Sequence, residues 1–352
     1  MARGIETGAR GAFEITLVPM ADGGEGTVDS FLAAGARRVA ARVRGPLGAP
    51  VEAAFALDGT TAVIEMAAAS GLELVPPAAR DAGRASTYGT GELIVRALDA
   101  GARHIVVAVG GSATTDGGAG CLSALGATFR DASARELAAG GLALRELASI
   151  DLSGLDPRLA TVEFEVAADV DNPLCGVHGA SAVFGPQKGA SPDDVVALDA
   201  ALARFADVSA QTQGLDLREV PGTGAAGGLA FALHAFLGAG IRPGIEIVAE
   251  LRGLPAALAG ALICFTGEGS IDAQTLRGKT VTGVNRLARA AGVSRVVAFG
   301  GRVTADAEAA LAREGITAVP ICDRPLTLEE SSRDAAALLE RAAARVTRLL
   351  ML

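Results

Sequence analysis

Short apolar runs alternate with amphipathic stretches along most of this chain. The runs that read as β-strands lie at residues 104–111, 162–170, 261–269, 295–301 and 316–322. One more strand is expected at 14–20, because the apolar residues Ile15 and Leu17 stand at alternate positions, as in a strand with one buried face. Because strands separated by helices form parallel sheets, the alternation toward the C-terminus predicts a parallel α/β arrangement.

Helical periodicity fills the spaces between these runs. The predicted helices lie at residues 87–102, 191–212, 280–291, 304–314 and 327–350. Ser191 is the expected N-cap of the second, with Pro192 at its first position. Thr327 and Glu330 form a capping-box pair at the start of the last.

The middle of the chain is less regular. Residues 51–66 read as a β-hairpin around Asp58-Gly59, a favoured two-residue turn. A hairpin requires antiparallel strands, so this region indicates a second domain of mixed α/β type. A length of 352 residues allows two domains.

Composition excludes several classes of partner. Only 3% of residues are aromatic, none is Trp and the net charge is −9, which disfavours nucleic acids and anionic membranes. No run approaches the ~20 apolar residues of a membrane span, and the N-terminus lacks the apolar core of a signal peptide. Four cysteines far apart in sequence predict reduced thiols in a cytoplasmic protein.

Six glycine-rich loops carry carboxylate or amide side chains. They lie at residues 22–27, 110–120, 168–176, 184–191, 221–228 and 266–280. Glycine lets other groups approach the backbone closely, helix N-termini bind phosphate, and carboxylates bind hard cations. These loops could instead be simple turns. Their number favours a nucleotide or phosphate enzyme that uses Mg²⁺.

The loop at 110–120 follows the most apolar strand and precedes a helix that starts near Gly118. Gly110 and Gly111 with the hydroxyls of Ser112 and Thr114 predict an anion-binding cradle, and Asp116 adds a carboxylate. The alternative is an ordinary strand–helix connection with an N-cap.

The loop at 266–272 also follows a buried strand. Gly267 and Glu268 lie at its start and Asp272 follows four residues after Glu268, so the two carboxylates can share a cation or orient a hydroxyl. Lys279 follows as a point charge for a phosphate or as a solvated surface residue. In the turn at 184–191, Lys188 contacts an anion or serves the turn alone.

Two further segments have open interpretations. Asp169 and Asp171, expected on one face of a strand end, suit Mg²⁺ or an Asx-turn. Residues 222–227 match the G-x-G-x-x-G pattern of dinucleotide sites, but the preceding segment is charged and not strand-like. We interpret that segment as a closely packed helix start.

In the run at 64–75, expected to be core, Glu65 is an isolated carboxylate.

Taken in order, these motifs resemble those of the type I glycerate kinase family. The matching segments are PMADGGEGT (19–27), EMAAASGLELVP (65–76), GTGELI (89–94), GGSATTDGGAG (110–120), FGPQKGAS (184–191), GAAGGL (224–229), GIEIV (244–248) and TGEGSID (266–272). The family normally opens with a strand and an Asp-Ser-Phe-Lys-like loop, whereas this chain joins the pattern near Gly4. At Tyr88 and Ser270 related sequences often carry arginine.

The resemblance implies two α/β domains. A Rossmann- or flavodoxin-like parallel-sheet domain would comprise residues 1–40 together with 241–352, and an inserted mixed α/β domain residues 41–240. It also implies Mg²⁺- and ATP-dependent phosphorylation of D-glycerate, with 2-phosphoglycerate the favoured product, in a monomer or homodimer.

Site roles follow from the motifs and the resemblance together. The expected catalytic residues are Asp22, Glu25, Asp116, Asp272 and Lys279. The expected substrate- and phosphate-binding residues are Gly110, Gly111, Ser112, Thr114, Gly267, Glu268 and Lys188, and the expected Mg²⁺ ligands are Asp169 and Asp171. The alternatives are an NAD-dependent dehydrogenase of a small hydroxy acid, resting on residues 222–227, and a catalytically impaired acid-binding protein.

Overall fold

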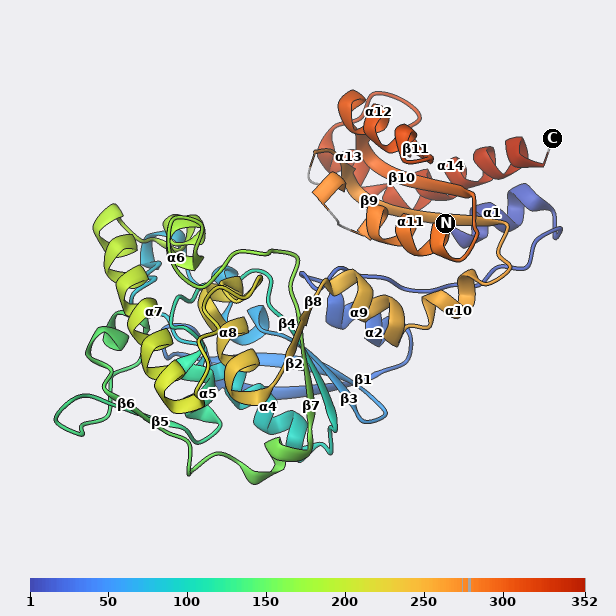
Figure 1. Cartoon of the computed structure of the whole chain (residues 1–352). Helices are drawn as coiled ribbons and strands as arrows, with labels where there is room; N and C mark the ends of the chain where they lie inside the picture. The colour runs from blue at the N-terminus through green and yellow to red at the C-terminus, as the bar shows by residue number, and fades with distance from the viewer. Residues whose placement is uncertain (274, 278–279, 352) are drawn as a thin grey trace. The chain divides into compact units, whose positions relative to one another are not determined.

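The computed structural model describes residues 1–273, 275–277 and 280–351. The chain divides into two compact units, one formed by residues 21–247 and the other by residues 1–20 with 248–352 (Figure 1). Both units are α/β, as the hydrophobic pattern predicts. The domain boundaries expected near residues 40 and 240, and the Rossmann- or flavodoxin-like character of the smaller unit, stay predictions.

The larger unit is built on a six-stranded mixed sheet with the order β1-β2-β3-β4-β7-β8. β1 pairs antiparallel with β2 and β2 with β3, whereas β3, β4, β7 and β8 are mutually parallel. The strands are β1 Arg37–Arg44, β2 Pro50–Asp58, β3 Thr61–Glu65, β4 His104–Ala108, β7 Glu163–Ala167 and β8 Gly240–Arg242.

Helices cover both faces of this sheet. Ile64, Ile105 and Val107 point to one face and share a core with Leu93 of α4 (Tyr88–Asp99) and with α8 (Ala225–Leu237). The strand residues between these positions point to the opposite face of the sheet, where α2 (Thr27–Ala33) packs on β2 and β3. Strand residues that are apolar on both faces are typical of such a three-layer arrangement.

A second core lies beyond α8, around the long helix α7 (Pro192–Gln213), which Figure 1 shows beside α5 and α8. Phe205 of α7 meets Phe129 and Phe231 edge to face, with ring centroids 5.9 and 5.5 Å apart. The shorter elements of this unit are α3 Ala67–Ser70, η1 Leu72–Leu74, η2 Pro77–Ala79, α5 Ala119–Ala124, β5 Thr128–Arg130, η3 Gly141–Glu146, β6 Ser149–Asp151, η4 Pro157–Thr161, α6 Ala180–Phe184 and η5 Pro186–Lys188. α9 (Gly244–Leu251) follows β8.

The smaller unit contains a parallel sheet with the order β11-β10-β9. Its first helix packs against its last, and Ile5, Phe299 and Leu338 share one core beneath them. Figure 1 shows the two helices at the chain ends side by side. The elements are α1 Ala2–Ala9, α10 Leu254–Leu258, β9 Ile263–Ile271, η6 Thr275–Arg277, α11 Thr280–Ala290, β10 Arg295–Val303, α12 Ala305–Arg313, β11 Ile316–Pro320, α13 Leu328–Arg333 and α14 Ala335–Leu350.

Most predicted elements are confirmed, with four corrections. The hairpin is present, but Asp58 pairs with Thr61, so its two-residue turn is Gly59-Thr60. The strand expected at 14–20 is wrong, because this segment is irregular and Leu17 is 69% exposed. The helix expected at 327–350 is interrupted at Asp334. The strand expected at 162–170 ends at Ala167, so residue 169 belongs to the following loop.

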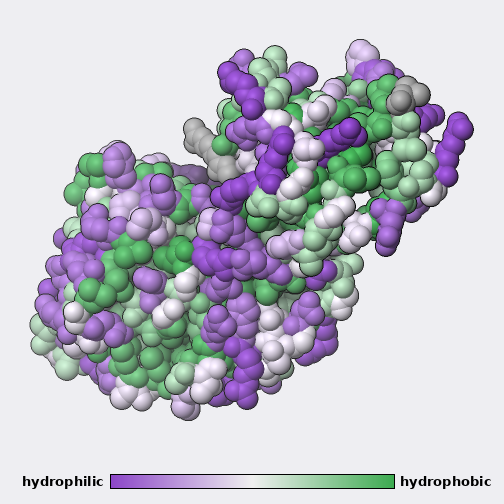
Figure 2. All heavy atoms as spheres, turned by 45° about the vertical axis from the view of Figure 1, so that its right-hand side comes forward, coloured by the Kyte–Doolittle hydropathy of each residue, from purple (hydrophilic) through white to green (hydrophobic). Residues whose placement is uncertain are grey.

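The surface is mixed in character. On the face shown in Figure 2, hydrophobic side chains lie among polar ones. In the part of the chain that the structure describes, no helix is both long and apolar enough to cross a membrane. All four cysteines are free thiols, as their spacing predicts.

Candidate functional site

The glycine-rich loops of the larger unit gather at the carboxyl ends of its parallel strands. Gly110 follows β4, and Gly244 lies two residues after β8. A Cβ atom at Gly110 would lie 3.2 Å from Gly24 Cα, and one at Gly244 would collide with the Asp22 carbonyl oxygen. The glycines therefore let the loop at 22–26 approach the strand ends, which is where open α/β sheets bind ligands.

The loop at 22–26 is held by its own polar groups. Asp22 Oδ1 accepts a hydrogen bond from Gly24 N at 3.2 Å, and Thr27 Oγ1 donates to Gly24 O at 2.7 Å. Asp22 is partly exposed and Glu25 is exposed. Both predicted carboxylates are thus at the surface of the carboxyl-end loops, where a ligand can reach them.

Glu65, at the end of β3, joins this group, although no role is predicted for it from the sequence alone. Its Oε1 accepts a hydrogen bond of 2.7 Å from Val28 N at the start of α2. Partial burial raises the pKa of Glu65, and the charges of Asp29 and Glu25 raise it further, while the Val28 N–H opposes them. The signal available in the sequence was a lone carboxylate in an otherwise apolar strand end.

The loop at 110–118 is fixed by backbone hydrogen bonds to two other segments. Gly110 and Gly111 are exposed, whereas Ser112 and Thr114 are buried beneath them. Ala113 N donates to Ser70 O at 2.9 Å, and Gly117 N donates to Gly227 O at 2.9 Å. The predicted anion-binding segment is therefore held on two sides by backbone hydrogen bonds.

Asp116 lies inside the protein at the end of this loop. Its carboxylate accepts hydrogen bonds from Thr87 N (2.8 Å), Thr87 Oγ1 (2.9 Å), Gly118 N (3.1 Å) and Gly120 N (3.2 Å). Burial raises the pKa of Asp116, and these donors oppose the rise because they stabilise the charged form. The carboxylate thus joins the start of α4 to the start of α5; its catalytic role stays a prediction.

The Lys188 side chain contacts the same loop from the interior of the protein. It is 2% exposed, and its Nζ donates to Ser112 Oγ at 2.8 Å and to the Thr114 carbonyl oxygen at 2.6 Å. Burial lowers the pKa of Lys188 to about 7, an effect that nearby Asp116 opposes. The ammonium group therefore faces the loop and not the solvent.

Asp169 and Asp171 are exposed in the loop after β7. Asp169 Oδ1 accepts a hydrogen bond of 3.1 Å from Gly244 N, the first residue of α9. Among the residues that the structure describes, no three His, Cys, Asp or Glu side chains are grouped so that they could hold a metal ion.

The smaller unit has its own polar segment at the carboxyl end of β9, and most of the loop expected at 266–272 belongs to this strand. Thr275 Oγ1 donates to Glu268 Oε1 and accepts from Asp272 N at 3.1 Å, while Ser270 Oγ donates to Asp272 Oδ2 at 3.1 Å. Gly267 precedes this network within β9. Thr275 Oγ1 thus links the Glu268 carboxylate to the backbone of Asp272, and the cation or hydroxyl that the two carboxylates were expected to share stays a prediction. Predicted residue Lys279 lies outside the described residues.

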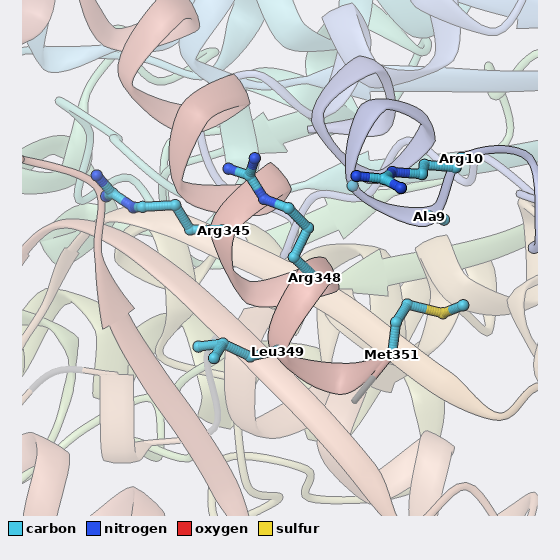
Figure 3. A pocket seen from close by; sticks show the side chains of 7 residues that line it. Ala9, Arg10, Arg345, Arg348, Leu349 and Met351 are labelled. Carbon is cyan, nitrogen blue, oxygen red and sulfur yellow. The ribbon is translucent and has the colours of Figure 1, made fainter.

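A separate groove lies between the first and last helices of this unit, with a cavity volume of about 680 Å³. Its lining residues are Gly8, Ala9, Arg10, Arg345, Arg348, Leu349 and Met351 (Figure 3). None of the predicted site residues belongs to it.

The segment at 222–227 has the close packing predicted for it. No strand directly precedes it, since residues 214–224 form turns and irregular structure. Ala226, Gly227 and Gly228 are left-handed, and the regular part of α8 begins after them. The arrangement that a dinucleotide fingerprint requires is a strand leading straight into the glycines.

Comparison with known proteins agrees with this arrangement. The model of the glycerate kinase family matches residues 1–351. The glycerate kinase of Bacillus subtilis (strain 168) is 47% identical, covering 97% of this chain and 91% of that protein. The glycerate 2-kinase of Escherichia coli (strain K12) is 50% identical, covering 82% of this chain and 77% of that protein.

A solved structure is also similar. The crystal structure of putative glycerate kinase 2 from Salmonella typhimurium LT2 has a TM-score of 0.87 and 45% identity, covering 99% of this chain and 93% of that one. Fold and relatives together define a phosphotransferase of the kinase class. The chain belongs to the glycerate kinase family, as its motifs predict.

Proposed function

We propose that this protein transfers the γ-phosphoryl group of ATP to D-glycerate, with 2-phosphoglycerate as the favoured product. Membership of the glycerate kinase family supports the reaction, and a 50% identical relative named glycerate 2-kinase supports the position of the phosphate. The observation that carries the proposal is the gathering of glycine-rich loops at the carboxyl edge of the larger sheet.

The loops suit a reaction that depends on positioning. Phosphoryl transfer requires little covalent chemistry from the protein and much orientation and charge neutralisation. Gly110 and Gly111 offer an exposed backbone and Ser112 a hydroxyl for an anionic oxygen. Asp22 and Glu25, on the neighbouring loop, are carboxylates suited to orient the acceptor hydroxyl.

The remaining predicted residues have narrower roles. Asp116 and Thr114 would keep the anion-binding loop in shape from beneath. Asp272, Glu268 and Gly267 form the polar strand end of the smaller unit, and Lys279 is proposed to neutralise phosphate charge.

The residues present fit an Mg²⁺ ion that is bound together with the phosphates of the nucleotide. Mg²⁺ is usually held by one or two carboxylates together with substrate phosphates, and not by an all-protein cage. Asp169 and Asp171 are exposed carboxylates at the strand edge, and no larger group of ligands is present among the described residues. When bound, the ion would neutralise phosphate charge, while the residues named above hold the reacting groups.

The dehydrogenase alternative has less support, because residues 222–227 do not follow a strand. ADP release by the full chain should depend on both D-glycerate and Mg²⁺, and ³¹P NMR of the product should show the 2-phosphate. No ADP release with D-glycerate would overturn the proposal and favour an impaired acid-binding protein. NADH binding with oxidation of a hydroxy acid would favour the dehydrogenase.

A further inference from the structure

Lysine is rare in this chain, and one of its lysines is buried under the anion-binding loop. The sequence has 29 arginines but only two lysines, Lys188 and Lys279. Lys188 is among the largest fully buried side chains of the protein. Burying an ammonium group is costly unless it is hydrogen bonded, so its partners indicate its role.

The chemistry of the two partners fixes the direction of one hydrogen bond. An ammonium group only donates, so Ser112 Oγ must accept from Lys188 Nζ at 2.8 Å. A serine hydroxyl has a single proton, and no other hydrogen bond of Ser112 Oγ occurs in the described part of the chain. That proton therefore remains available to an acceptor outside the protein.

The surroundings of Ser112 show where that acceptor would lie. Ser112 directly follows the exposed Gly110 and Gly111, and it is 8% exposed. Lys188 also holds the Thr114 carbonyl oxygen at 2.6 Å, so it fixes the loop on both sides of residue 113. Lys188 thus fixes both the loop backbone and the hydroxyl that the loop presents.

We propose that Lys188 is a positioning residue, which holds the Ser112 hydroxyl as a hydrogen-bond donor to an anionic oxygen of the substrate. The inference rests on the proposed function for the identity of the substrate. The shared chemistry is a carboxylate of the acid or a phosphate of the nucleotide, and Lys188 itself touches neither.

Protonation of Lys188 should govern this donor. A neutral amine has a lone pair that can accept the Ser112 proton, so the hydroxyl would turn inward once Lys188 loses its charge. Burial brings the pKa of Lys188 to about 7. Affinity for the anion should therefore fall as pH rises through this value.

Few charged groups act on Lys188 in its pocket. Asp116, at the start of α5, favours the charged lysine. Arg80, in the segment after η2, donates from Nη1 to the Gln187 carbonyl oxygen at 3.2 Å. α6 carries no titratable side chain, and at the start of α7 Asp193 is exposed and Asp194 partly exposed.

Two variants test the proposal by steady-state kinetics. Lys188→Met removes the ammonium group, and Ser112→Ala removes the hydroxyl while leaving Lys188 bound to Thr114 O. Loss of a hydrogen bond to a charged group costs about tenfold or more in affinity. Each variant should raise one KM by about tenfold, the KM for D-glycerate if the acid is the acceptor or that for Mg-ATP if the nucleotide is. The double variant should be no worse than either single one.

The wild-type KM should rise between pH 6 and 8.5, and this step should be absent in Ser112→Ala. Unchanged KM values for both substrates in Ser112→Ala, or a loss of kcat alone, would overturn the inference. Catalysis by the wild type would meanwhile leave the proposed function intact. If Lys188→Met fails to fold, Ser112→Ala alone decides.

A readout without turnover separates the two proposals further. With ¹³Cε-lysine labelling the full chain gives only two lysine environments, assigned with Lys279→Arg. Saturation with D-glycerate, Mg-ATP or inorganic phosphate, added separately, should raise the Lys188 titration midpoint, because binding and protonation favour each other reciprocally. A midpoint that none of the three ligands shifts would contradict the inference even in an active enzyme. A shift in an enzyme that fails to phosphorylate glycerate would support it while the proposed function fails.

Discussion

Asp116 and Glu65 are both acids removed from water, but their partners give them different roles. Asp116 is 1% exposed and accepts hydrogen bonds from four donors at the N-terminal ends of α4 and α5. Glu65 accepts a hydrogen bond from Val28 N and keeps part of its surface exposed. We therefore expect Asp116 to matter first for stability and Glu65 first for function.

Asp116→Asn should destabilise the protein. The amide would present an NH₂ group to donors that need an acceptor, and an unsatisfied buried donor costs about 1–3 kcal/mol. Asp131→Asn is a matched control, because Asp131 also caps loop N–H groups, those of Ser133 and Arg135, but in an exposed turn. Urea unfolding should show the larger loss for Asp116→Asn. Equal losses would mean that the buried network does not act as described.

Glu65→Gln should gain stability relative to the wild type as pH rises. Folding raises the pKa of Glu65, so its stabilising contribution is complete below the unfolded value near 4.5 and is lost as pH rises through the folded pKa. Glutamine can still accept from Val28 N. Urea midpoints at pH 4.5 and 7.5 measure the effect, and a variant that loses relative stability at the higher pH would contradict the assignment. Lower kcat/KM in the same variant would place Glu65 in the site.

At the scale of elements, the turn at 226–228 shows how closely two segments of the larger unit meet. Gly227 is left-handed with φ +66°, and a Cβ there would collide with the Thr114 carbonyl oxygen. The same carbonyl accepts the Lys188 hydrogen bond. The glycine turn and the anion-binding loop are thus packed directly on each other.

Gly227→Ala should therefore cost more than conformational strain alone. Gly214, the C-cap of α7, is the control: it has φ +77° and nothing within 4 Å of a Cβ. Gly214→Ala should cost about 1 kcal/mol for the left-handed backbone. Gly227→Ala should add about 1–3 kcal/mol of overpacking. Thermal unfolding of the two variants gives the comparison. Similar losses of stability would contradict the prediction, because they would show that the loop around Thr114 moves aside for the added methyl group at no energetic cost.

Sequence predicted the elements well where local signals were strong. The capping box of Thr327 and the N-cap of Ser191 start helices where expected, because these signals are local. β1 was missed, since its many arginines hide the alternation of an edge strand. The segment 14–20 alternates but has no partner strand in the described structure, and pairing is a tertiary property.

The candidate site was predictable to a similar degree. The glycine-rich loops were identified by composition, because close backbone approach requires glycine. The burial of Lys188 and the bond from Val28 N to Glu65 depend on residues far apart in sequence. No spacing rule contains that information, so Lys188 was expected as a direct charge partner and Glu65 was given no role.

At the scale of the whole molecule, each unit places polar, glycine-rich loops at the carboxyl ends of parallel strands. In the larger unit these follow β4, β7 and β8, and in the smaller one the loop after β9 carries Asp272. The family match covers both units, at residues 1–351. The proposed function therefore depends above all on the substrate being held at the carboxyl edge of the larger sheet.

The most direct test compares two aspartates that make the same local turn. Asp22 Oδ1 accepts from Gly24 N at the proposed site, and Asp151 Oδ1 accepts from Ser153 N in the loop after β6, away from it. The measurement is kcat/KM for D-glycerate in Asp22→Asn and Asp151→Asn. Loss of a preorganised charged group in the site should cost on the order of 10²-fold, and the Asp151 change should leave the rate within about twofold. Near-normal rates in both variants would contradict the claim.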